Sequence, residues 1–331
     1  MERRTFGRTG LQLSILGFGC GAVGGLMVRG TPSDQERAVA KAIEAGINYF
    51  DTAAQYGNGE SEKNLGRILA KLKPNVIVGT KVRILSADFN RIAAAVGESL
   101  DASLKRMGKE QVDIFHLHNA ITTGGGGESL SAAQVLNDVV PAFEKLREQG
   151  KLRFPGITAV GDTAALHQVI DARAFFSAQV SYNMLNPSAA ESLPPRYPAQ
   201  DYGKMFDHTR AAGVGVVGIR VLAGGALSGV TERHPIASPP PDPIGSANSY
   251  NADLERAGRL MPLVHEGYAA TLSEAAIRFA MTHEAMGSIL VGMATIDQFE
   301  QSLAAVNKGP LPSAALVRLA ELQKGFVGEQ R

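Results

Sequence analysis

Eight short apolar runs alternate with longer amphipathic segments along the chain, and this alternation limits the possible folds more than any other feature. Several runs are apolar at nearly every position, which is typical of strands covered on both faces of a parallel sheet. The expected strands are Ile15–Cys20, Ile47–Thr52, Val76–Val82, Val112–His118, Phe154–Val160, Ala178–Met184, Val214–Val221 and Ser288–Met293.

The segments between these runs have helical periodicity. After the third run, apolar side chains recur every three or four positions at Ile92, Val96, Leu100, Leu104 and Met107, so one helix face can pack on a sheet. Repeated strand and helix units predict an α/β fold, a (β/α)8 TIM barrel. Because such barrels reach 331 residues as one unit, we expect residues 1–331 to form a single domain.

Charge and cysteine content narrow the class of ligand. The chain has 33 Lys and Arg against 32 Asp and Glu, a balance that offers no attraction for nucleic acid or an anionic membrane. It has no run of about 18 apolar residues, so no membrane span is expected. Its one cysteine, Cys20, cannot form an internal disulfide, and no Cys and His spacing suggests a metal site. We therefore expect a cytoplasmic protein with a small-molecule ligand and no metal.

Polar residues stand at the ends of three consecutive runs. Asp51 is the last residue but one of the second run, Lys81 is the last but one of the third, and His118 is the last of the fourth. Tyr56 follows Asp51 in the next loop. The carboxyl ends of barrel strands share one mouth. We therefore expect these four side chains to form a catalytic site.

The chemistry of these residue types is that of carbonyl reduction. A carbonyl that accepts hydride at carbon needs a proton at oxygen, and a phenol with a pKa near 10 is a poor donor or acceptor at neutral pH. We expect Lys81 to lower the pKa of Tyr56, Asp51 to keep Lys81 protonated, and His118 to hydrogen-bond the substrate oxygen.

Each of these residues also has a simpler interpretation. Lys81 and Asp51 can form a purely structural ion pair, Tyr56 can be a half-buried loop aromatic, and His116 and His118 can both be core residues on one strand face. Alternatively, Lys81 can be the Schiff-base amine of a barrel lyase or isomerase, although a carboxylate partner argues against that role.

Three motifs point to a known family. The stretch from Phe50 to Glu62, the triplet Gly79-Thr80-Lys81 and the run from Val112 to His118 resemble characteristic motifs of the aldo-keto reductase family. The similarity extends from Arg8 to about Leu303. It implies a barrel closed at the bottom by an N-terminal β-hairpin, with NAD(P)H bound across the top. It also implies that Tyr56 is the general acid/base, that Lys81 and Asp51 tune it, and that His118 orients the substrate.

The resemblance also implies residues at the nicotinamide end of the cofactor. Gln179 matches the residue that binds the carboxamide, Thr158 keeps a hydroxyl where the family usually has serine, and Ala159 replaces the usual asparagine. Ile219 stands where an aromatic ring normally packs on the nicotinamide, and Arg220 introduces a charge. The other positions assigned to this end of the cofactor site are Gly19, Asp51, Leu222 and Gly224.

At the adenosine end, an arginine or lysine normally binds the 2′-phosphate of NADP. This chain has Ala294 and Gln298 there, so its residues leave NADP and NAD both open, while the family resemblance favours NADP(H). Thr295, at the start of a helix, can still hold an anion. The adenosine-end positions implied by the resemblance are Gly292, Met293, Thr295, Gln298 and Ser302.

These observations predict an NAD(P)H-dependent oxidoreductase that interconverts an aldehyde, ketone or sugar-like carbonyl with the alcohol. The alternative is a cofactor-binding regulatory or redox-sensor protein that resembles the potassium-channel β subunits. The sequence leaves open the physiological substrate, the preferred direction, and the choice between a monomer and a homo-oligomer.

Overall fold

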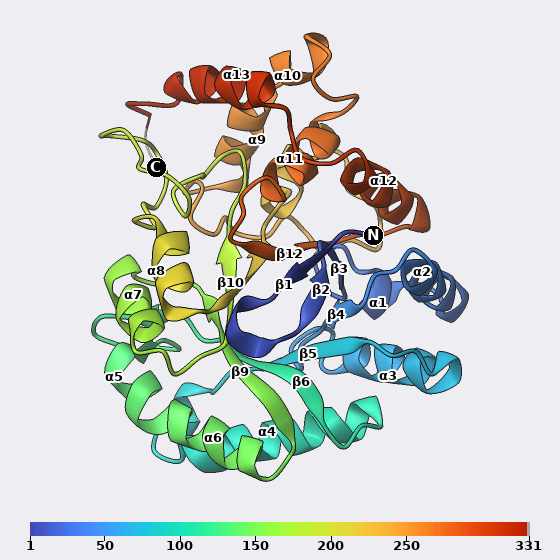
Figure 1. The fold of residues 1–331 in the computed structure, drawn as a ribbon, viewed down its shortest axis with the longest axis vertical. Coiled ribbons are helices and arrows are strands. Elements are labelled where there is room, and N and C mark those ends of the chain that lie inside the picture. The colour runs from blue at the N-terminus through green and yellow to red at the C-terminus, as the bar shows by residue number, and fades with distance from the viewer. Residues whose placement is uncertain (330–331) are drawn as a thin grey trace.

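The computed structural model describes residues 1–329, and a closed barrel of eight parallel strands lies at its centre (Figure 1). Neighbouring barrel strands follow one another along the chain, and the last strand closes on the first. The predicted α/β barrel is thereby confirmed. The barrel strands are β3 (Leu16–Gly19), β4 (Tyr49–Asp51), β5 (Ile77–Val82), β6 (Val112–Leu117), β9 (Leu152–Ala159), β10 (Ser177–Ser181), β11 (Gly215–Ile219) and β12 (Met286–Val291).

Helices follow each strand and surround the barrel, as Figure 1 shows. Their apolar faces pack on the outside of the strands, which are therefore buried on both sides. The helices that follow the eight strands are α2 (Pro32–Glu44), α3 (Glu60–Leu72), α4 (Ile92–Met107), α6 (Val140–Glu148), α7 (Thr163–Asp171), α8 (Met205–Ala212), α11 (Leu272–Ala280) and α12 (Ile296–Asn307). The described chain also contains α1 (Leu26–Arg29), α5 (Ala132–Gln134), α9 (Tyr250–Gly258), α10 (Pro262–His265) and α13 (Ser313–Lys324).

Several strand ends differ from the expected runs. β12 begins two residues before Ser288 and ends before Gly292, and β9 begins two residues before Phe154. β10 ends at Ser181, because the Asn183 side chain accepts hydrogen bonds from the next backbone amides and turns the chain out of the sheet. Apolar residues continue past these ends because the loops there are buried too.

The N-terminal hairpin implied by the family resemblance closes the bottom of the barrel. Its strands β1 (Arg3–Thr5) and β2 (Gln12–Ser14) pair antiparallel and lie across the barrel end in Figure 1. The fully buried ring of Phe6 packs against Gly215 and Gly287, where an added Cβ would lie 2.6–2.7 Å from the ring. The opposite end is therefore the open one.

Two long loops lie at that opposite end. The loop after β6 forms a short parallel pair, β7 (Ile121–Thr122) and β8 (Leu130–Ser131), and the loop from 231 to 251 follows β11. The second loop crosses to the segment after β3, where Arg29 Nε donates to the Ile236 carbonyl at 2.6 Å. Both connections thus surround the mouth on which the predicted site residues lie.

Candidate active site

A buried ion pair between neighbouring strands forms the base of the site. Lys81 Nζ on β5 donates to Asp51 Oδ2 at the end of β4 at 2.5 Å and to the Thr52 carbonyl at 2.8 Å. Burial by itself lowers the pKa of Lys81, but the Asp51 carboxylate and the nearby Tyr56 phenol outweigh it, and the pKa is raised. Lys81 is therefore an ammonium ion at neutral pH.

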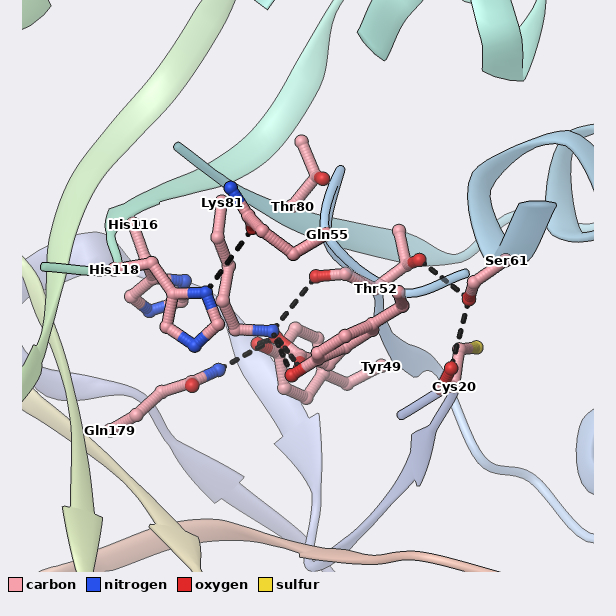
Figure 2. Close-up of polar contacts among 12 residues, drawn as sticks. Cys20, Tyr49, Thr52, Gln55, Ser61, Thr80, Lys81, His116, His118 and Gln179 are labelled. Atoms are coloured by element: carbon pink, nitrogen blue, oxygen red, sulfur yellow. Dashed lines mark hydrogen bonds and ion pairs between the residues drawn. The ribbon is translucent and has the colours of Figure 1, made fainter. Parts of the chain in front are cut away.

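Two further donors hold the other oxygen of the Asp51 carboxylate. Asp51 Oδ1 accepts from Tyr49 Oη at 3.0 Å and from Gln179 Nε2 on β10 at 2.7 Å. Lys81, Tyr49 and Gln179, which lie close together in Figure 2, thus bind the two oxygens of this carboxylate between them. A buried carboxylate with this many donors stays oriented. Sequence reasoning missed Tyr49, although alternation along β4 places it on the same face as Asp51.

Tyr56 lies above this pair in the loop between β4 and α3. Its hydroxyl is 3.2 Å from Lys81 Nζ, and its side chain is only partly buried. The loop is held by Ser61, whose hydroxyl donates to the Cys20 carbonyl and bonds to the Thr52 hydroxyl (Figure 2). The phenol is therefore fixed beside the ammonium while one side of it faces the mouth.

Lys81 is only one of the influences on the pKa of Tyr56. Burial raises the pKa of the Tyr56 phenol, the Lys81 ammonium lowers it, and the net result is a raised pKa. Lys81 thus lowers the pKa as expected, but it does not bring the pKa below its ordinary value, because burial has the larger effect. At neutral pH Tyr56 is a protonated phenol and can donate a proton. The Lys81 ammonium beside it would then stabilise the phenolate that remains.

His118 completes the group of four side chains. It follows β6 directly, and its ring meets the edge of the Tyr56 ring with centroids 6.2 Å apart. Its Nδ1 lies 3.3 Å from Gln55 Oε1. Burial, then the charges of Lys81 and Arg83, lower the pKa of His118 to about 3. A neutral imidazole has one donor and one acceptor nitrogen, so it can bond to a carbonyl oxygen or a hydroxyl.

The low pKa of His118 predicts a pH dependence of stability. The unfolded chain takes up this proton near pH 6.5, whereas the folded protein takes it up only near pH 3. His118 therefore contributes stability above pH 6.5 that is lost as the pH falls from 6.5 toward 3. In urea unfolding at several pH values, we expect His118→Asn to lose stability less steeply than the wild type below pH 6.5.

The matched control for that comparison is His265→Asn, since His265 lies exposed at the end of α10. We expect this variant to follow the wild-type slope. The ring signals of His118 in NMR spectra should not shift between pH 5 and 8. A His118 titration centred near pH 6 would contradict the prediction.

His116, the other histidine on β6, is a core residue below this site. Its Nε2 lies 2.8 Å from Ser177 Oγ on β10, and the bond passes over Gly156, where a Cβ would lie 2.6 Å from the imidazole. Burial, then Lys81 and His118, lowers its pKa well below the ordinary value. The core interpretation therefore applies to His116 and not to His118.

Residues suited to the nicotinamide carboxamide lie beside Asp51. Thr158 on β9 and Gln179 on β10 are register partners, so their side chains share the inner face of the barrel. Within the described chain the Thr158 hydroxyl is buried without a hydrogen-bond partner. An unsatisfied buried hydroxyl is unfavourable, so these two groups fit a ligand with an amide.

The other predicted cofactor positions line the same side of the mouth. They follow β3, β11 and β12, which are adjacent in the barrel. Gly19 ends β3, Ile219 ends β11 and Arg220 comes next, and the turn after it has a positive φ at Gly224. The positions that lie here and lead to the adenosine end are Gly19, Ile219, Arg220, Leu222, Gly224, Gly292 and Met293.

At the adenosine end, the predicted side chains bond to their own helix. Thr295 caps α12 by accepting from the Gln298 amide, and Gln298 Oε1 accepts from the Ala294 amide at 2.7 Å. The Ser302 hydroxyl donates to the Gln298 carbonyl. Gly292 is exposed, with no atom nearer than 3.6 Å to a Cβ placed on it. At this end, the groups available to a ligand are therefore the exposed backbone at Gly292 and the N-terminus of α12.

Other reactive groups do not join the site. Cys20 is fully buried, and burial and the Asp51 charge raise its pKa, so its thiol stays protonated. Over residues 1–329, no three His, Cys, Asp or Glu side chains are grouped to hold a metal ion. None of the helices described there has the length and apolar character to cross a membrane.

The mouth of the (β/α)8 barrel thus holds a protonated phenol beside a buried ammonium and a neutral imidazole. This arrangement is that of a barrel enzyme that can donate a proton to its substrate. Comparison with known proteins identifies the family. The sequence model of the Aldo/keto reductase family matches residues 15–324, and the chain belongs to this family. It is an NAD(P)-dependent oxidoreductase.

Similar proteins extend over almost the whole chain. L-galactose dehydrogenase of Arabidopsis thaliana is 30% identical over 316 residues, which cover 93% of this chain and 89% of the relative. Pyridoxal 4-dehydrogenase of Microbacterium luteolum is 24% identical, covering 91% and 92%. The holo form of aldo-keto reductase AKR11C1 from Bacillus halodurans superposes with a TM-score of 0.73 at 25% identity, covering 100% of this chain and 99% of that one.

Proposed function

We propose that this protein interconverts a carbonyl and an alcohol by hydride transfer, with Tyr56 as the general acid/base. One observation carries the proposal. The Tyr56 hydroxyl lies 3.2 Å from the fully buried Lys81 ammonium, which Asp51 in turn binds. A cation at this place stabilises a phenolate, so the proton can leave the phenol and return to it.

The residues divide the proton transfer between them. In reduction, bound NAD(P)H would supply the hydride for the carbonyl carbon. Tyr56 Oη gives its proton to the carbonyl oxygen. Lys81 stabilises the phenolate that remains, and Asp51 keeps Lys81 charged. His118, neutral at the pH of the reaction, hydrogen-bonds the substrate oxygen and orients it. Oxidation of an alcohol follows the same steps in reverse.

In this proposal, residues from β9 to α12 would hold the cofactor at the mouth. Thr158 and Gln179 would hold the carboxamide, and Ile219 would present an apolar side chain to the nicotinamide ring. Gly292 and the start of α12 receive the adenosine end, where exposed glycine backbone and a helix N-terminus suit phosphate oxygens. We keep NADP(H) ahead of NAD(H) in the proposal on the family resemblance alone, since Ala294 and Gln298 supply no cation for a 2′-phosphate.

The proposed substrates are small polar aldehydes, ketones or sugar-like compounds. The names of two relatives, a dehydrogenase of L-galactose and one of pyridoxal, support compounds with several hydroxyl groups or a polar ring. The half-buried Tyr56 and His118 leave the reacting atoms open to such a ligand. A reducing compartment such as the cytoplasm suits the single unpaired Cys20.

The test is the initial rate of NADPH and NADH oxidation with 4-nitrobenzaldehyde, and of NADP and NAD reduction with L-galactose. Turnover with either cofactor supports the proposal, and a higher kcat/KM with NADPH supports the cofactor preference. Absence of turnover with both cofactors, while both bind in a fluorescence titration, would contradict the enzymatic function and favour the regulatory alternative.

A further inference from the structure

Gln55, the residue before Tyr56 in the loop after β4, is hydrogen-bonded to the ring of His118. Its Oε1 lies 3.3 Å from His118 Nδ1, and a dashed line marks this bond in Figure 2. Within residues 1–329, no other side chain hydrogen-bonds this ring, and the Gln55 side chain makes no second hydrogen bond. Gln55 is exposed, so its amide can rotate without losing another partner.

The other ring nitrogen of His118 is free to meet a substrate. Nε2 has no hydrogen-bond partner among residues 1–329, and it is not sealed in the interior, so it is open to the mouth. The neutral imidazole carries one proton for its two nitrogens. The bond that Nδ1 makes therefore decides whether Nε2 can donate or accept a hydrogen bond.

The amide of Gln55 can stabilise either position of this proton. With its carbonyl toward the ring, it accepts from Nδ1–H, and His118 Nε2 is left with a lone pair that cannot bond to a carbonyl oxygen. Rotation of the amide by about 180° brings its NH2 group to Nδ1 instead. His118 Nε2 then carries the proton and can donate to a carbonyl oxygen, where negative charge develops during hydride transfer.

We propose that Gln55 selects the tautomer of His118. Its carbonyl holds the proton on Nδ1 in the free enzyme, and its amide turns when a carbonyl compound binds, so that Nε2 donates to the reacting oxygen. The change moves no net charge, because Nδ1 gives a proton to water and Nε2 takes one from water at this half-buried ring. Gln55 is thus a positioning residue that acts through His118. This inference rests on the proposed function, since it explains how His118 bonds the substrate oxygen there.

The first experiment compares kcat/KM for NADPH-dependent reduction of 4-nitrobenzaldehyde at pH 8 in two variants. Gln55→Glu has nearly the same shape but can only accept, so it holds the proton on Nδ1, and we expect a loss of about 10- to 100-fold. Gln55→Met removes the polar group and leaves both tautomers accessible, so its loss should stay below about 5-fold. Gln149→Glu, exposed at the end of α6, controls for the added carboxylate and should match the wild type.

The pH profile gives a second readout, because a protonated imidazole donates from both nitrogens. The titratable and charged groups around the His118 ring are Lys81, Arg83, His116 and Tyr56. A carboxylate at position 55 opposes the Lys81 and Arg83 charges and raises the pKa of His118 from about 3 to about 4 to 6. The rate of Gln55→Glu relative to the wild type should therefore rise as the pH is lowered from 8 to 5, whereas that of Gln55→Met should not.

NMR of the protein with 15N-labelled histidine reports the tautomer without any turnover. At pH 8 we expect the His118 proton on Nδ1 in the free wild type and in Gln55→Glu, and partly on Nε2 in Gln55→Met. The signals absent from His118→Asn identify the ring. If Gln55→Met fails to fold, Gln55→Ala replaces it.

Two results would overturn the proposal. The same His118 tautomer in the wild type and in Gln55→Met would show that Gln55 does not select it. Equal losses in Gln55→Glu and Gln55→Met at every pH would make Gln55 a residue that only fills space. A wild type without turnover would count against the proposed function instead, and the tautomer measurement would still decide whether Gln55 controls His118.

Discussion

Replacing Tyr56 with phenylalanine is expected to lower kcat for aldehyde reduction by about 10²- to 10⁴-fold, the usual contribution of a positioned general acid. The phenol lies 3.2 Å from the Lys81 ammonium and is half-buried at the mouth, and the variant removes only its oxygen. The measurement is the rate of NADPH and NADH oxidation, with the cofactor Kd determined in parallel. Because no cofactor contact is assigned to the Tyr56 hydroxyl, the Kd should change little.

Tyr49→Phe is the matched control. Its hydroxyl donates to the same Asp51 carboxylate at 3.0 Å, but Tyr49 is fully buried and does not face the mouth. We expect that variant to lose less than about 10-fold in kcat, because Asp51 keeps its bonds to Lys81 and Gln179. Similar losses in the two variants would mean that Tyr56 supports the structure of the site and does not transfer the proton.

The sequence predicted the barrel because its strands are covered on both sides. In a strand such as Val112–His118, apolar residues flank the polar residues that face the barrel interior. This pattern can be recognised without knowing the conformation of the loops. Strand ends were harder to predict, since Tyr182 to Met184 stay buried after β10 has ended. Apolarity reports burial, and burial does not stop where hydrogen bonding between strands stops.

The positions of the site residues were predictable because they depend on the order of the strands. Their pKa values were not predictable, because these depend on how deeply each side chain is buried. Asp51, Lys81 and His118 end neighbouring strands, so topology alone brings them together. The net rise in the pKa of Tyr56 could not be predicted, because it depends on how far burial outweighs the Lys81 charge. The Thr158 hydroxyl, which has no hydrogen-bond partner among residues 1–329, is likewise a property of the packed structure.

Replacing Lys81 with methionine should have two large effects, one on rate and one on stability. Burial raises the pKa of Tyr56, and the Lys81 ammonium lowers it. Without the ammonium, alcohol oxidation, which needs the phenolate, should therefore shift to higher pH. We expect kcat at pH 7 to fall by about 10²- to 10⁴-fold. The measurement is the pH profile of alcohol oxidation for both proteins.

The effect on stability comes from the carboxylate left behind. Asp51 keeps its bonds to Tyr49 and Gln179 but becomes a buried charge without a counter-charge. Breaking a buried pair in this way typically costs about 3 to 5 kcal/mol in the free energy of unfolding. Urea unfolding measures that cost, and the double variant Asp51→Asn with Lys81→Met should recover much of it, because its buried side chains are neutral.

The double variant also separates the three roles considered for Lys81. A structural ion pair predicts that activity returns together with stability, whereas a proton-transfer role predicts a stable protein that remains slow. A Schiff-base amine predicts instead that borohydride traps a covalent adduct between the wild type and an aldehyde. We expect no adduct, because Asp51 holds Lys81 as an ammonium without a free electron pair to attack a carbonyl.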